Sequence, residues 1–570
     1  MQDFSKFSEI KYERPNFKQV RKDILDSVKI MKKAKTYEEF KKGYLHAENA
    51  MQEMASMVTI SSIRNTIDMN DKFYDEEEKY LNRAGATVAL ASLKLLDTVL
   101  SSSFKDDINK EYGPYLLKQL ENNKKIASKK IIFLSIKEGS LSQKYSKLVA
   151  NAKTTFMNEE CNFYGLLKHM QSTNREERKE AFFAFSKLYE SIASELDNIY
   201  TELVNVRCKT AKRLKFDSYI DYIYLRRGRY DYTKKDVAAF RESVRKYIVP
   251  LCQKLFDMQK EDLGIDKLHF YDEDLTFKDG NAKPEGTWQE LVKKASLMYS
   301  ELSSETKEFF DFMTEHELFD LETRPGKHMG GYCTFIPKYK APFIFSNFNG
   351  TSADVDVLTH EAGHAFQFYL GSRNIDNEML QSSTSEIDEI HSMTMEHFTY
   401  PFMDKFFKEN KNKYLYHHLT NAVKVIPYLV SVDEFQHKVF ENPKMSASER
   451  RTTWKEIEKT YMPWRDYDND NFFENGAFWM QKQHIFLYPF YYVDYALAQS
   501  CAFQLFLRGI DNFDVAWTDY VNLCKAGGTK GYFDLLAVAR LESPFEEKTI
   551  KDIASKIEKV IDGFRAKVKE

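Results

Sequence analysis

Residues 356–365 read "DVLTHEAGHA", which places two histidines four positions apart with a glutamate directly after the first. On an α-helix, residues i and i+4 lie one above the other. His360 and His364 can therefore direct two imidazoles at one point, as a tetrahedral zinc ion requires of two ligands. Glu361 lies roughly 100° around the helix from His360. From there its carboxylate can take a proton from an activated water without joining the ligands.

The residues around this motif favour a metal site over a chance match. With 13 histidines in the chain, a random HExxH is expected on the order of a few per cent of the time. Two buried imidazoles without a shared partner would also cost free energy. We therefore predict one Zn²⁺ per chain. The apolar side chains that indicate a buried helix are Val355, Leu358, Ala362, Ala365 and Phe366.

A catalytic zinc needs a third protein ligand and leaves its fourth position open. The candidates lie in "NEMLQSSTSEIDEIHSMTMEHF", residues 377–398. If Ser383 caps a helix here with Glu386 as its capping-box partner, the geometry favours Glu389, and His391 is its main competitor. The full set of candidates is Glu378, Glu386, Asp388, Glu389, His391 and Glu396.

The composition of the whole chain narrows the classes of protein and partner. The 570 residues carry 83 basic and 86 acidic side chains, a formal charge of −3, and 43% are hydrophobic. This balance excludes a strong field for nucleic acid or an anionic membrane. No apolar run approaches the length of a membrane span, roughly 18 residues or more. The first 20 residues lack the apolar core that a signal peptide has, and the six cysteines are scattered, so we expect reduced thiols and a cytoplasmic protein.

Apolar residues at spacings of three and four predict a mainly α-helical fold. Thr173 and Glu176 have capping-box spacing at the start of one predicted helix. Aromatic and β-branched residues at 328–348 predict a hairpin or small sheet, followed by a helix over roughly 352–370. We divide the chain into an N-terminal helical region, 1–200, and a catalytic region, 201–570. The other predicted helices cover 36–66, 77–103, 174–214, 234–262 and 286–316.

A second group of polar and aromatic residues lies in "QHIFLYPFYYVDYALA", residues 483–498. Tyr488, Tyr492 and Tyr495 are spaced by four and three, so on a helix their phenols could line one wall. Together with His484 they could supply neutral donors to an oxyanion. An aromatic stripe in a hydrophobic core is the structural alternative for each tyrosine.

Several of these stretches together resemble one family. "DVLTHEAGHAFQ", followed 25 residues after its second histidine by "EIHSMTME", resembles the thimet oligopeptidase and oligoendopeptidase F family of zinc peptidases. The stretches "GKHMGGYCTFIP" and "PFIFSNFNGT" upstream look like the family's substrate-edge strands. Downstream, "VDEFQHKVFENP" at 432–443 and "PFYYVDYALA" at 489–498 are similar to the oligoendopeptidase F branch.

The resemblance implies a role for each matching residue of the metal site. It implies His360, His364 and Glu389 as zinc ligands and Glu361 as the general base. The choice of Glu389 over its competitors therefore depends more on the family than on the predicted helix geometry.

The resemblance also implies how the substrate is held. It implies that His484 and the tyrosines contact the oxyanion and the substrate backbone, with Tyr495 favoured for the oxyanion and Tyr488 next. A peptide is expected to add beside an exposed strand edge, where glycines allow close approach. The substrate-binding residues implied in this way are Gly330, Gly331, Tyr332 and Tyr492.

Together these observations predict a multi-lobed, mainly α-helical zincin-type peptidase that encloses a deep channel, with a small β-sheet next to the HExxH helix. We expect it to hydrolyse internal bonds of short oligopeptides in the cytoplasm, with neither nucleic acid nor membrane as a partner. Two alternatives remain: a helical zinc carboxypeptidase, and a non-catalytic helical protein with a structural metal. Cleavage of an end-blocked peptide distinguishes the first of these, and an open coordination position argues against the second.

Overall fold

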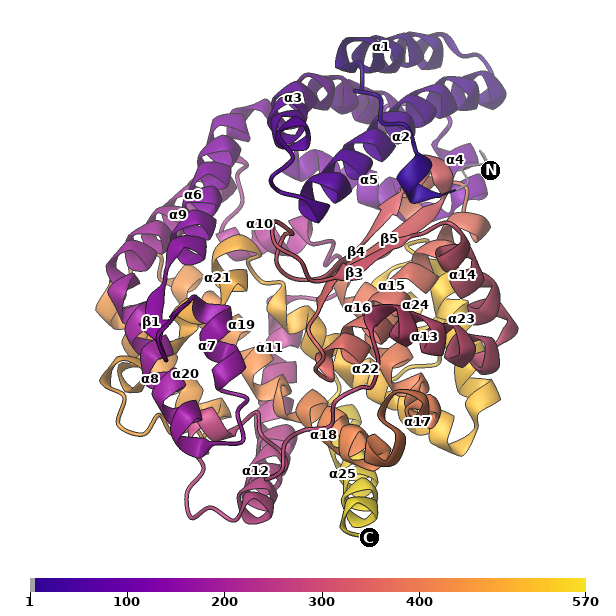
Figure 1. The fold of residues 1–570 in the computed structure, drawn as a ribbon. Coiled ribbons are helices and arrows are strands. Elements are labelled where there is room, and N and C mark those ends of the chain that lie inside the picture. The colour runs from indigo at the N-terminus through magenta and orange to yellow at the C-terminus, as the bar shows by residue number, and fades with distance from the viewer. Residues whose placement is uncertain (1–5) are drawn as a thin grey trace. The chain divides into compact units, whose positions relative to one another are not determined.

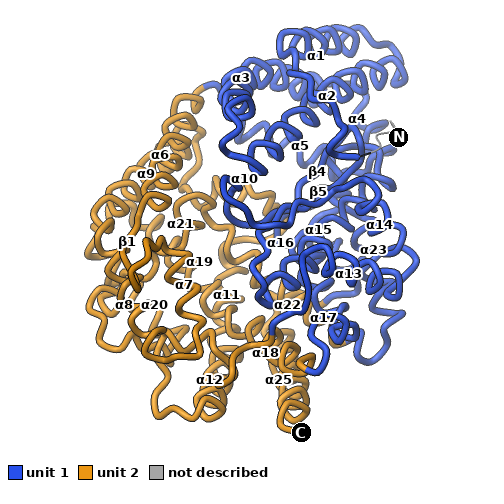
Figure 2. Tube along the Cα trace, viewed as in Figure 1, with its two compact units in different colours: residues 1–129, 283–409, 508–541 blue, residues 130–282, 410–507, 542–570 orange. Residues whose placement is uncertain are grey.

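The structure, a computed structural model that describes residues 6–570, consists mainly of α-helices with two small sheets (Figure 1). This confirms the predicted fold class. The chain forms two compact units, each assembled from three separate segments (Figure 2). The predicted division at residue 200 falls inside helix α9 (Ala193–Arg213) and remains a prediction. Unit 1 comprises residues up to 129, 283–409 and 508–541, and unit 2 comprises 130–282, 410–507 and 542–570.

Unit 1 begins with five helices that pack around one hydrophobic cluster. In α1 the buried residues Phe17, Val20, Ile24 and Val28 recur every three or four positions, which gives the helix one apolar face. The helix predicted over 36–66 is confirmed as α2. The five helices are α1 (Phe17–Lys33), α2 (Tyr37–Ile67), α3 (Lys72–Leu100), α4 (Lys105–Tyr112) and α5 (Pro114–Ile126).

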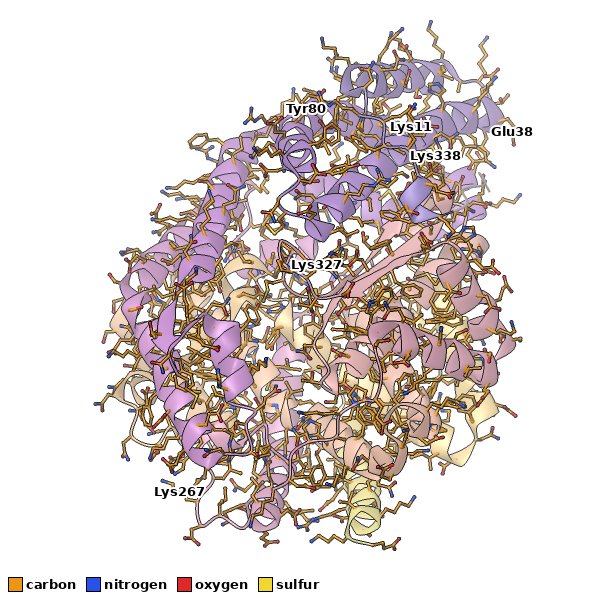
Figure 3. All side chains as sticks on the ribbon, in the orientation of Figure 1. Lys11, Glu38, Tyr80, Lys267, Lys327 and Lys338 are labelled. Atoms are coloured by element: carbon orange, nitrogen blue, oxygen red, sulfur yellow. The ribbon has the colours of Figure 1, made fainter. Side chains whose placement is uncertain are left out.

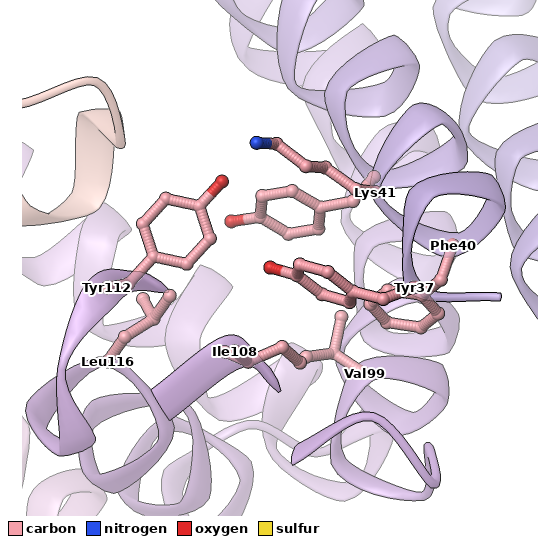
Figure 4. A pocket seen from close by; sticks show the side chains of 8 residues that line it. Tyr37, Phe40, Lys41, Val99, Ile108, Tyr112 and Leu116 are labelled. Carbon is pink, nitrogen blue, oxygen red and sulfur yellow. The ribbon is translucent and has the colours of Figure 1, made fainter. Parts of the chain in front are cut away.

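A small aromatic pocket lies among these helices, lined in part by Tyr37, Lys41 and Tyr112 (Figure 4). The Tyr37 hydroxyl donates to Glu111 at 2.6 Å, and the Lys41 ammonium pairs with the same carboxylate at 2.5 Å. The cavity volume is about 10 Å³, which is about the space that one water molecule needs. The pocket is therefore a packing feature of the N-terminal helices and has no room for a ligand.

The sheet of unit 1 has three strands in the order β3-β5-β4. The central strand β5 runs antiparallel to β4, with Tyr332 opposite Phe345, and parallel to β3. The prediction of a hairpin or small sheet at 328–348 is confirmed, whereas β3 adds a strand outside that range. The strands are β3 (Phe319–Glu322), β4 (Tyr332–Ile336) and β5 (Ala341–Phe348).

Lys327 joins two of these strands through a side chain that is fully buried (Figure 3). Its ammonium donates to the carbonyl oxygens of Glu322 at 2.8 Å and Ser346 at 2.5 Å. It also pairs with the Asp320 carboxylate at 2.6 Å. Burial lowers the pKa of Lys327, although the hydrogen bond and charge of Asp320 oppose that shift. The lysine thus supplies donors at the place where the β3–β5 register shifts.

The remaining helices of unit 1 include those that carry the HExxH motif and its downstream partner. The helix predicted over 286–316 is divided at Ser303, whose extended backbone begins α14 and whose side chain accepts the Thr306 N–H. The helix predicted at 352–370 is confirmed. These helices are α13 (Trp288–Leu302), α14 (Ser304–Glu315), α15 (Ala353–Asn374), α16 (Ser385–Phe398), α17 (Asp404–Phe407), α23 (Phe513–Ala526) and α24 (Tyr532–Val538).

Unit 2 has an aromatic core in which Trp479 packs against Tyr200 at 5.0 Å and against Phe435 at 5.1 Å between ring centroids. Its two-stranded antiparallel sheet pairs β1 (Thr154–Phe156) with β2 (Glu159–Cys161). The helices, besides α9 and the larger part of α22 (Tyr492–Asp511), are α6 (Ile132–Asn151), α7 (Phe163–His169), α8 (Arg175–Ser191), α10 (Tyr219–Arg226), α11 (Lys234–Ser243), α12 (Val249–Leu263), α18 (Lys411–Lys424), α19 (Ile426–Glu441), α20 (Ala447–Tyr461), α21 (Gln483–Leu487) and α25 (Glu547–Lys569).

Local signals misplaced one helix start in unit 2. The predicted capping residue Thr173 is wrong, because Asn174 is the N-cap of α8 and its side chain accepts the Glu176 N–H at 3.1 Å. Asparagine and threonine can both cap a helix, so the sequence alone offered two neighbouring choices. The stretch predicted as one helix over 234–262 contains α11 and α12, which are separated by a π-helical turn at Val244–Ile248.

Across residues 6–570, no single helix has both the length and the hydropathy of a membrane span. Only α3 and α4 taken together, with a bend of 99° between them, meet that test by length and composition. All six cysteines of this part of the chain are free thiols.

Candidate metal centre

Helix α15 presents both histidines of the motif on one side. The ring centroids of His360 and His364 lie 5.0 Å apart with an angle of 84° between the rings. The side chains of Leu358, Ala362 and Ala365 are fully buried and hold the helix in the interior of unit 1. The buried apolar face and the i, i+4 spacing therefore fix the two imidazoles as the sequence predicted.

Gly363, between the two histidines, lets a second helix approach α15 closely. A Cβ atom at this position would lie 2.6 Å from the carbonyl oxygen of His391 and 2.6 Å from the Cα atom of Ser392, both in α16. Real Cβ atoms essentially never approach that closely, so any other residue would force the two helices apart. This role of Gly363 was not predicted from the sequence, although a glycine inside a helical pattern is itself a signal of close packing.

The close approach of α16 brings Glu389 to both histidines. Its Oε2 atom lies 3.3 Å from Nε2 of His360 and 3.4 Å from Nε2 of His364. One ligand atom from each residue lies within 4.8 Å of the other two. Two imidazole nitrogens and one carboxylate oxygen form a donor set that suits a catalytic zinc ion, which takes three protein ligands and leaves one position open. The residues present therefore fit the predicted metal.

A second carboxylate of α16 orients His360. Nδ1 of His360 lies 2.6 Å from Oε1 of Glu396. With the proton on Nδ1 and donated to Glu396, the lone pair of Nε2 remains available for a metal. From the sequence, Glu396 was predicted only as a possible third ligand, because its seven-residue separation from Glu389 does not reveal which side of the imidazole each carboxylate meets.

The carboxylates of the site have opposite pKa shifts. Burial raises the pKa of Glu361, against the charges of His360 and His364. For Glu389, burial is outweighed by the charge of His364 and by hydrogen bonds from both histidines, so its pKa lies well below the usual range. Burial would lower the pKa of His360, but hydrogen bonds to Glu389 and Glu396 raise it well above its usual value. Without a metal, the Glu389 carboxylate and the His360 imidazole thus favour each other's charged forms, so a metal that binds Nε2 of His360 would have to displace a proton.

The other candidates for the third ligand lie outside this cluster within the described chain. His391 is fully buried, and burial lowers its pKa to about 3, so the imidazole is neutral. The Tyr520 hydroxyl donates to the His391 carbonyl oxygen at 2.9 Å. Asp388 accepts the Ser383 N–H at 3.1 Å. The predicted capping box of Ser383 and Glu386 is wrong, because the N-cap of α16 is Thr384.

The predicted substrate-binding glycines precede β4, a terminal strand of the unit 1 sheet. Gly330 has a φ of +92°, a conformation that glycine adopts readily and other residues avoid. A Cβ atom on Gly331 would lie 3.3 Å from the carbonyl oxygen of Phe345, so the second glycine permits tight packing on β5. The backbone conformation of Gly330 and the packing of Gly331 are each enough to explain why a glycine is present. Contact of either residue with a substrate therefore stays a proposal.

Tyr332 is the first residue of β4, and its side chain is engaged inside unit 1. Its hydroxyl lies 2.7 Å from Oγ1 of Thr66, and its ring stacks on Phe345 with centroids 4.9 Å apart. Burial raises the pKa of Tyr332 to about 12. Any contact of Tyr332 with a peptide would therefore involve its backbone more naturally than its phenol.

The predicted histidine and tyrosines of residues 484–495 form a second cluster, within unit 2. The ring centroid of His484 lies 4.7 Å from that of Tyr492, 5.8 Å from Tyr488 and 6.3 Å from Tyr495. Tyr488 is 53% exposed. The structure thus brings these four side chains together, as the sequence analysis expected.

The reason given for that arrangement, a shared helical face, is wrong for Tyr488. Helix α21 ends at Leu487 and α22 begins at Tyr492, so only Tyr492 and Tyr495 share a helix. Pro489 lies between the two helices and has no N–H to continue the hydrogen-bond pattern. The residue after it, Phe490, has a φ of +61°. A turn, and not a helix face, carries Tyr488 to the cluster.

The scaffold and the candidate metal centre define a helical HExxH protein in which a carboxylate from a second helix meets the two histidines. Comparison with known families gives the particular family. The model described as "Peptidase family M3" matches residues 168–555, and that described as "Peptidase M3 N-terminal domain" matches residues 7–127. The chain therefore belongs to peptidase family M3.

Individual relatives confirm the resemblance to the oligoendopeptidase F branch. "Oligopeptidase PepF" of Bacillus subtilis is 22% identical over 580 residues, which cover 94% of this chain and 81% of the relative. "Oligoendopeptidase F homolog" of Borreliella burgdorferi is 23% identical over 478 residues, with coverages of 79% and 77%. The solved structure "PZ peptidase A with inhibitor 2" is 42% identical, with a TM-score of 0.93 over 98% of this chain and 99% of that one.

Proposed function

We propose that the protein is a zinc-dependent endopeptidase that hydrolyses internal peptide bonds of short oligopeptides. One observation carries this proposal: His360, His364 and Glu389 converge from two helices, with the carboxylate of Glu361 beside them on α15. Three ligands favour a catalytic over a structural zinc, since structural sites are usually closed by four. We infer one Zn²⁺ per chain.

The side chains of this site have distinct tasks in the proposed reaction. Nε2 of His360, Nε2 of His364 and the Glu389 carboxylate would hold the zinc ion, which supplies a more acidic water and a polarised substrate carbonyl. Glu361 takes a proton from the attacking water and passes it to the leaving nitrogen. Glu396 holds the imidazole of His360 in the required tautomer and orientation.

Neutral donors of the second cluster would stabilise the negative charge that develops on the carbonyl oxygen. We assign this role to His484, Tyr495 and Tyr488, with Tyr495 the principal donor. Phenols and an imidazole N–H suit the task because they donate hydrogen bonds without adding a second full charge. The rings of Tyr488 and Tyr495 both lie close to that of His484 in unit 2, which supports a shared role in binding one oxygen.

The substrate backbone is proposed to add beside β4. Because β4 is a terminal strand among the described residues, one side of it has no partner strand in its sheet, and an extended peptide can bind there by β-strand addition. Gly330, Gly331 and the backbone of Tyr332 would allow close approach. Tyr492, in the second cluster, is proposed as a further substrate contact.

We further propose that the substrates are short peptides in the cytoplasm, because the family resemblance implies an enclosed channel. Neither nucleic acid nor membrane is proposed as a partner, in keeping with the formal charge of −3. Folded proteins and long unfolded chains should therefore both resist cleavage. Incubation with casein tests the size limit: rapid degradation by the pure enzyme would contradict the channel.

An end-blocked, internally quenched fluorescent peptide tests the activity. The enzyme should cut it, lose activity with a chelator and regain it with zinc. Glu361→Gln should keep one zinc by elemental analysis and lose about a hundred- to ten-thousandfold in rate. The matched control is Glu386→Gln, which changes a buried glutamate of α16 outside the metal cluster and should turn over normally.

Three results would contradict the proposal. Insensitivity to chelation would exclude a metal-dependent reaction. Normal turnover by a zinc-loaded Glu361→Gln variant would remove Glu361 as the base. Cleavage that needs a free C-terminus would favour the carboxypeptidase.

A further inference from the structure

The tyrosines of unit 2 are joined by an unusual turn, here called the tyrosine turn, residues 488–491. The carbonyl oxygen of Tyr488 accepts the N–H of Tyr491 at 3.1 Å. Pro489 is the second residue and Phe490, with a φ of +61°, is the third. This is the type II pattern, whose third position normally holds glycine or asparagine. A phenylalanine there has an unfavourable backbone conformation.

The surrounding structure fixes Phe490 on every side. Its N–H donates to Oε1 of Gln436, in α19, at 3.0 Å. Its carbonyl oxygen accepts from Nη2 of Arg229 at 2.6 Å. Its ring is fully buried and lies 4.9 Å from His437 and 5.8 Å from Phe440 between centroids. The unfavourable backbone is thus imposed by tertiary contacts, as strained residues at functional sites commonly are.

The same arginine also fixes the start of α22, beyond the turn. Arg229 donates to Oδ1 of Asp494 at 2.5 Å, and Arg227 donates to Oδ2 at 2.9 Å. The Asp494 side chain is fully buried. The guanidinium of Arg227 also lies 4.6 Å from the ring centroid of Tyr491. One set of polar groups therefore holds both the turn and the helix that carries Tyr492 and Tyr495.

We propose that Gln436 and Arg229 are positioning residues of the peptidase, which fix the tyrosine turn and so the directions of Tyr488 and Tyr495. The inference depends on the proposed function, in which these phenols contact the substrate. It also gives a physical reason for two stretches that the sequence analysis noted separately. The residues 432–443 supply the acceptor for Phe490, and residues 489–498 supply the turn.

Gln436 is the better residue to test. Removing Arg229 would deprive the buried Asp494 carboxylate of one of its two cations, and general destabilisation would then obscure any effect on the turn. Gln436→Met keeps the length of the side chain and removes the acceptor for Phe490. It also removes the longer bond, 3.3 Å, that the Gln436 amide donates to the Val432 carbonyl oxygen within α19. The matched control is Gln259→Met in α12. Gln259 is also buried in unit 2, where it donates to the carbonyl oxygens of Asp272, Glu273 and Leu275 and accepts from Nζ of Lys424 at 2.6 Å. It therefore makes more hydrogen bonds than Gln436, which makes it a stringent control for loss of stability.

The measurements are kcat and KM on the end-blocked peptide, the melting temperature and the zinc content. Gln436→Met should lower kcat between about ten- and a hundredfold, because small misplacements of a contacting group have effects of that size. Its KM should stay within about twofold and its zinc content should not change. Gln259→Met should lower the melting temperature at least as much, yet change kcat by less than about threefold.

Repeating the Gln436 substitution in a variant without the two tyrosine hydroxyls distinguishes loss of positioning from a general loss of structure. In a Tyr488→Phe, Tyr495→Phe chain, where the two hydroxyls are already absent, Gln436→Met should cost less than about threefold further in kcat. Gln436→Asn withdraws the amide by one methylene and should show the same dependence on background, so the test does not depend on one variant folding. Normal kcat in both Gln436 variants, or an equal loss in both backgrounds, would overturn the inference. Normal turnover by the double Phe chain would instead overturn the proposed role of the tyrosines.

Discussion

Replacing Gly363 with alanine should weaken zinc binding by forcing α15 and α16 apart. The new methyl group would lie 2.6 Å from the carbonyl oxygen of His391 and from Cα of Ser392, whereas ordinary contact begins at 3.4 Å. The helices must therefore separate by roughly 0.8 Å, the difference between these distances. Both neighbouring atoms belong to the backbone, so no side-chain rotation can relieve the contact. Glu389 lies on the helix that moves.

The expected magnitudes follow from this displacement. Overpacking costs about 1–3 kcal/mol, and the better helix propensity of alanine returns about 1 kcal/mol. The net loss of stability without metal should therefore be no more than about 2 kcal/mol. Metal–ligand distances tolerate deviations of only about 0.2 Å. Zinc affinity should consequently fall by about tenfold or more, which is the usual effect of mutating residues that orient metal ligands.

The assay is a competition titration of zinc against a chelating dye, together with thermal unfolding in zinc and in EDTA. Gly563→Ala is the matched control, because Gly563 lies within α25 and a Cβ there meets nothing within 4 Å. The control should gain up to about 1 kcal/mol and keep its zinc affinity. If Gly363→Ala binds zinc as tightly as the wild type and melts no lower, the close approach of the helices does not control the site.

Three further predictions concern single side chains. Glu389→Ala should lose stoichiometric zinc by elemental analysis while His391→Ala keeps it; the reverse result would move the third ligand. Tyr495→Phe should lower kcat and kcat/KM together by on the order of a hundred- to a thousandfold with KM nearly unchanged, and a normal rate in steady-state kinetics would make this phenol structural. Burial raises the pKa of Glu48 to about 7 from 4.5, so the folded state binds more protons between these pH values and loses stability as pH rises through them. Glu48→Gln should therefore gain up to roughly 3 kcal/mol at pH 8 and little at pH 4 in urea unfolding; an equal change at both pH values would show that burial of the charge is not the cause.

Local features of the site could be predicted from the sequence because they depend on helix geometry alone. The spacing of His360 and His364 brings two imidazoles together on any α-helix, and the apolar residues around them predict its burial. Glu389 was selected by the family resemblance, since one helix cannot indicate where another helix packs. The same limit explains the treatment of Tyr488: four-residue spacing suggested a helix, but Pro489 and the contacts of Phe490 impose a turn.

By itself, the sequence determined the helical class, the pairing of His360 and His364 on one helix face, and the position of the β4–β5 hairpin. Periodicity, i, i+4 spacing and turn residues act over a few neighbouring positions. The tertiary structure alone decided that Glu396 meets Nδ1 of His360, that Gly363 admits α16, and that β3 pairs in parallel with β5. It also decided that each unit is assembled from three separate segments. These features depend on contacts between residues far apart in the chain. A glutamate or glycine carries the same local preference wherever it occurs, so only the packing of the helices around it gives it its role.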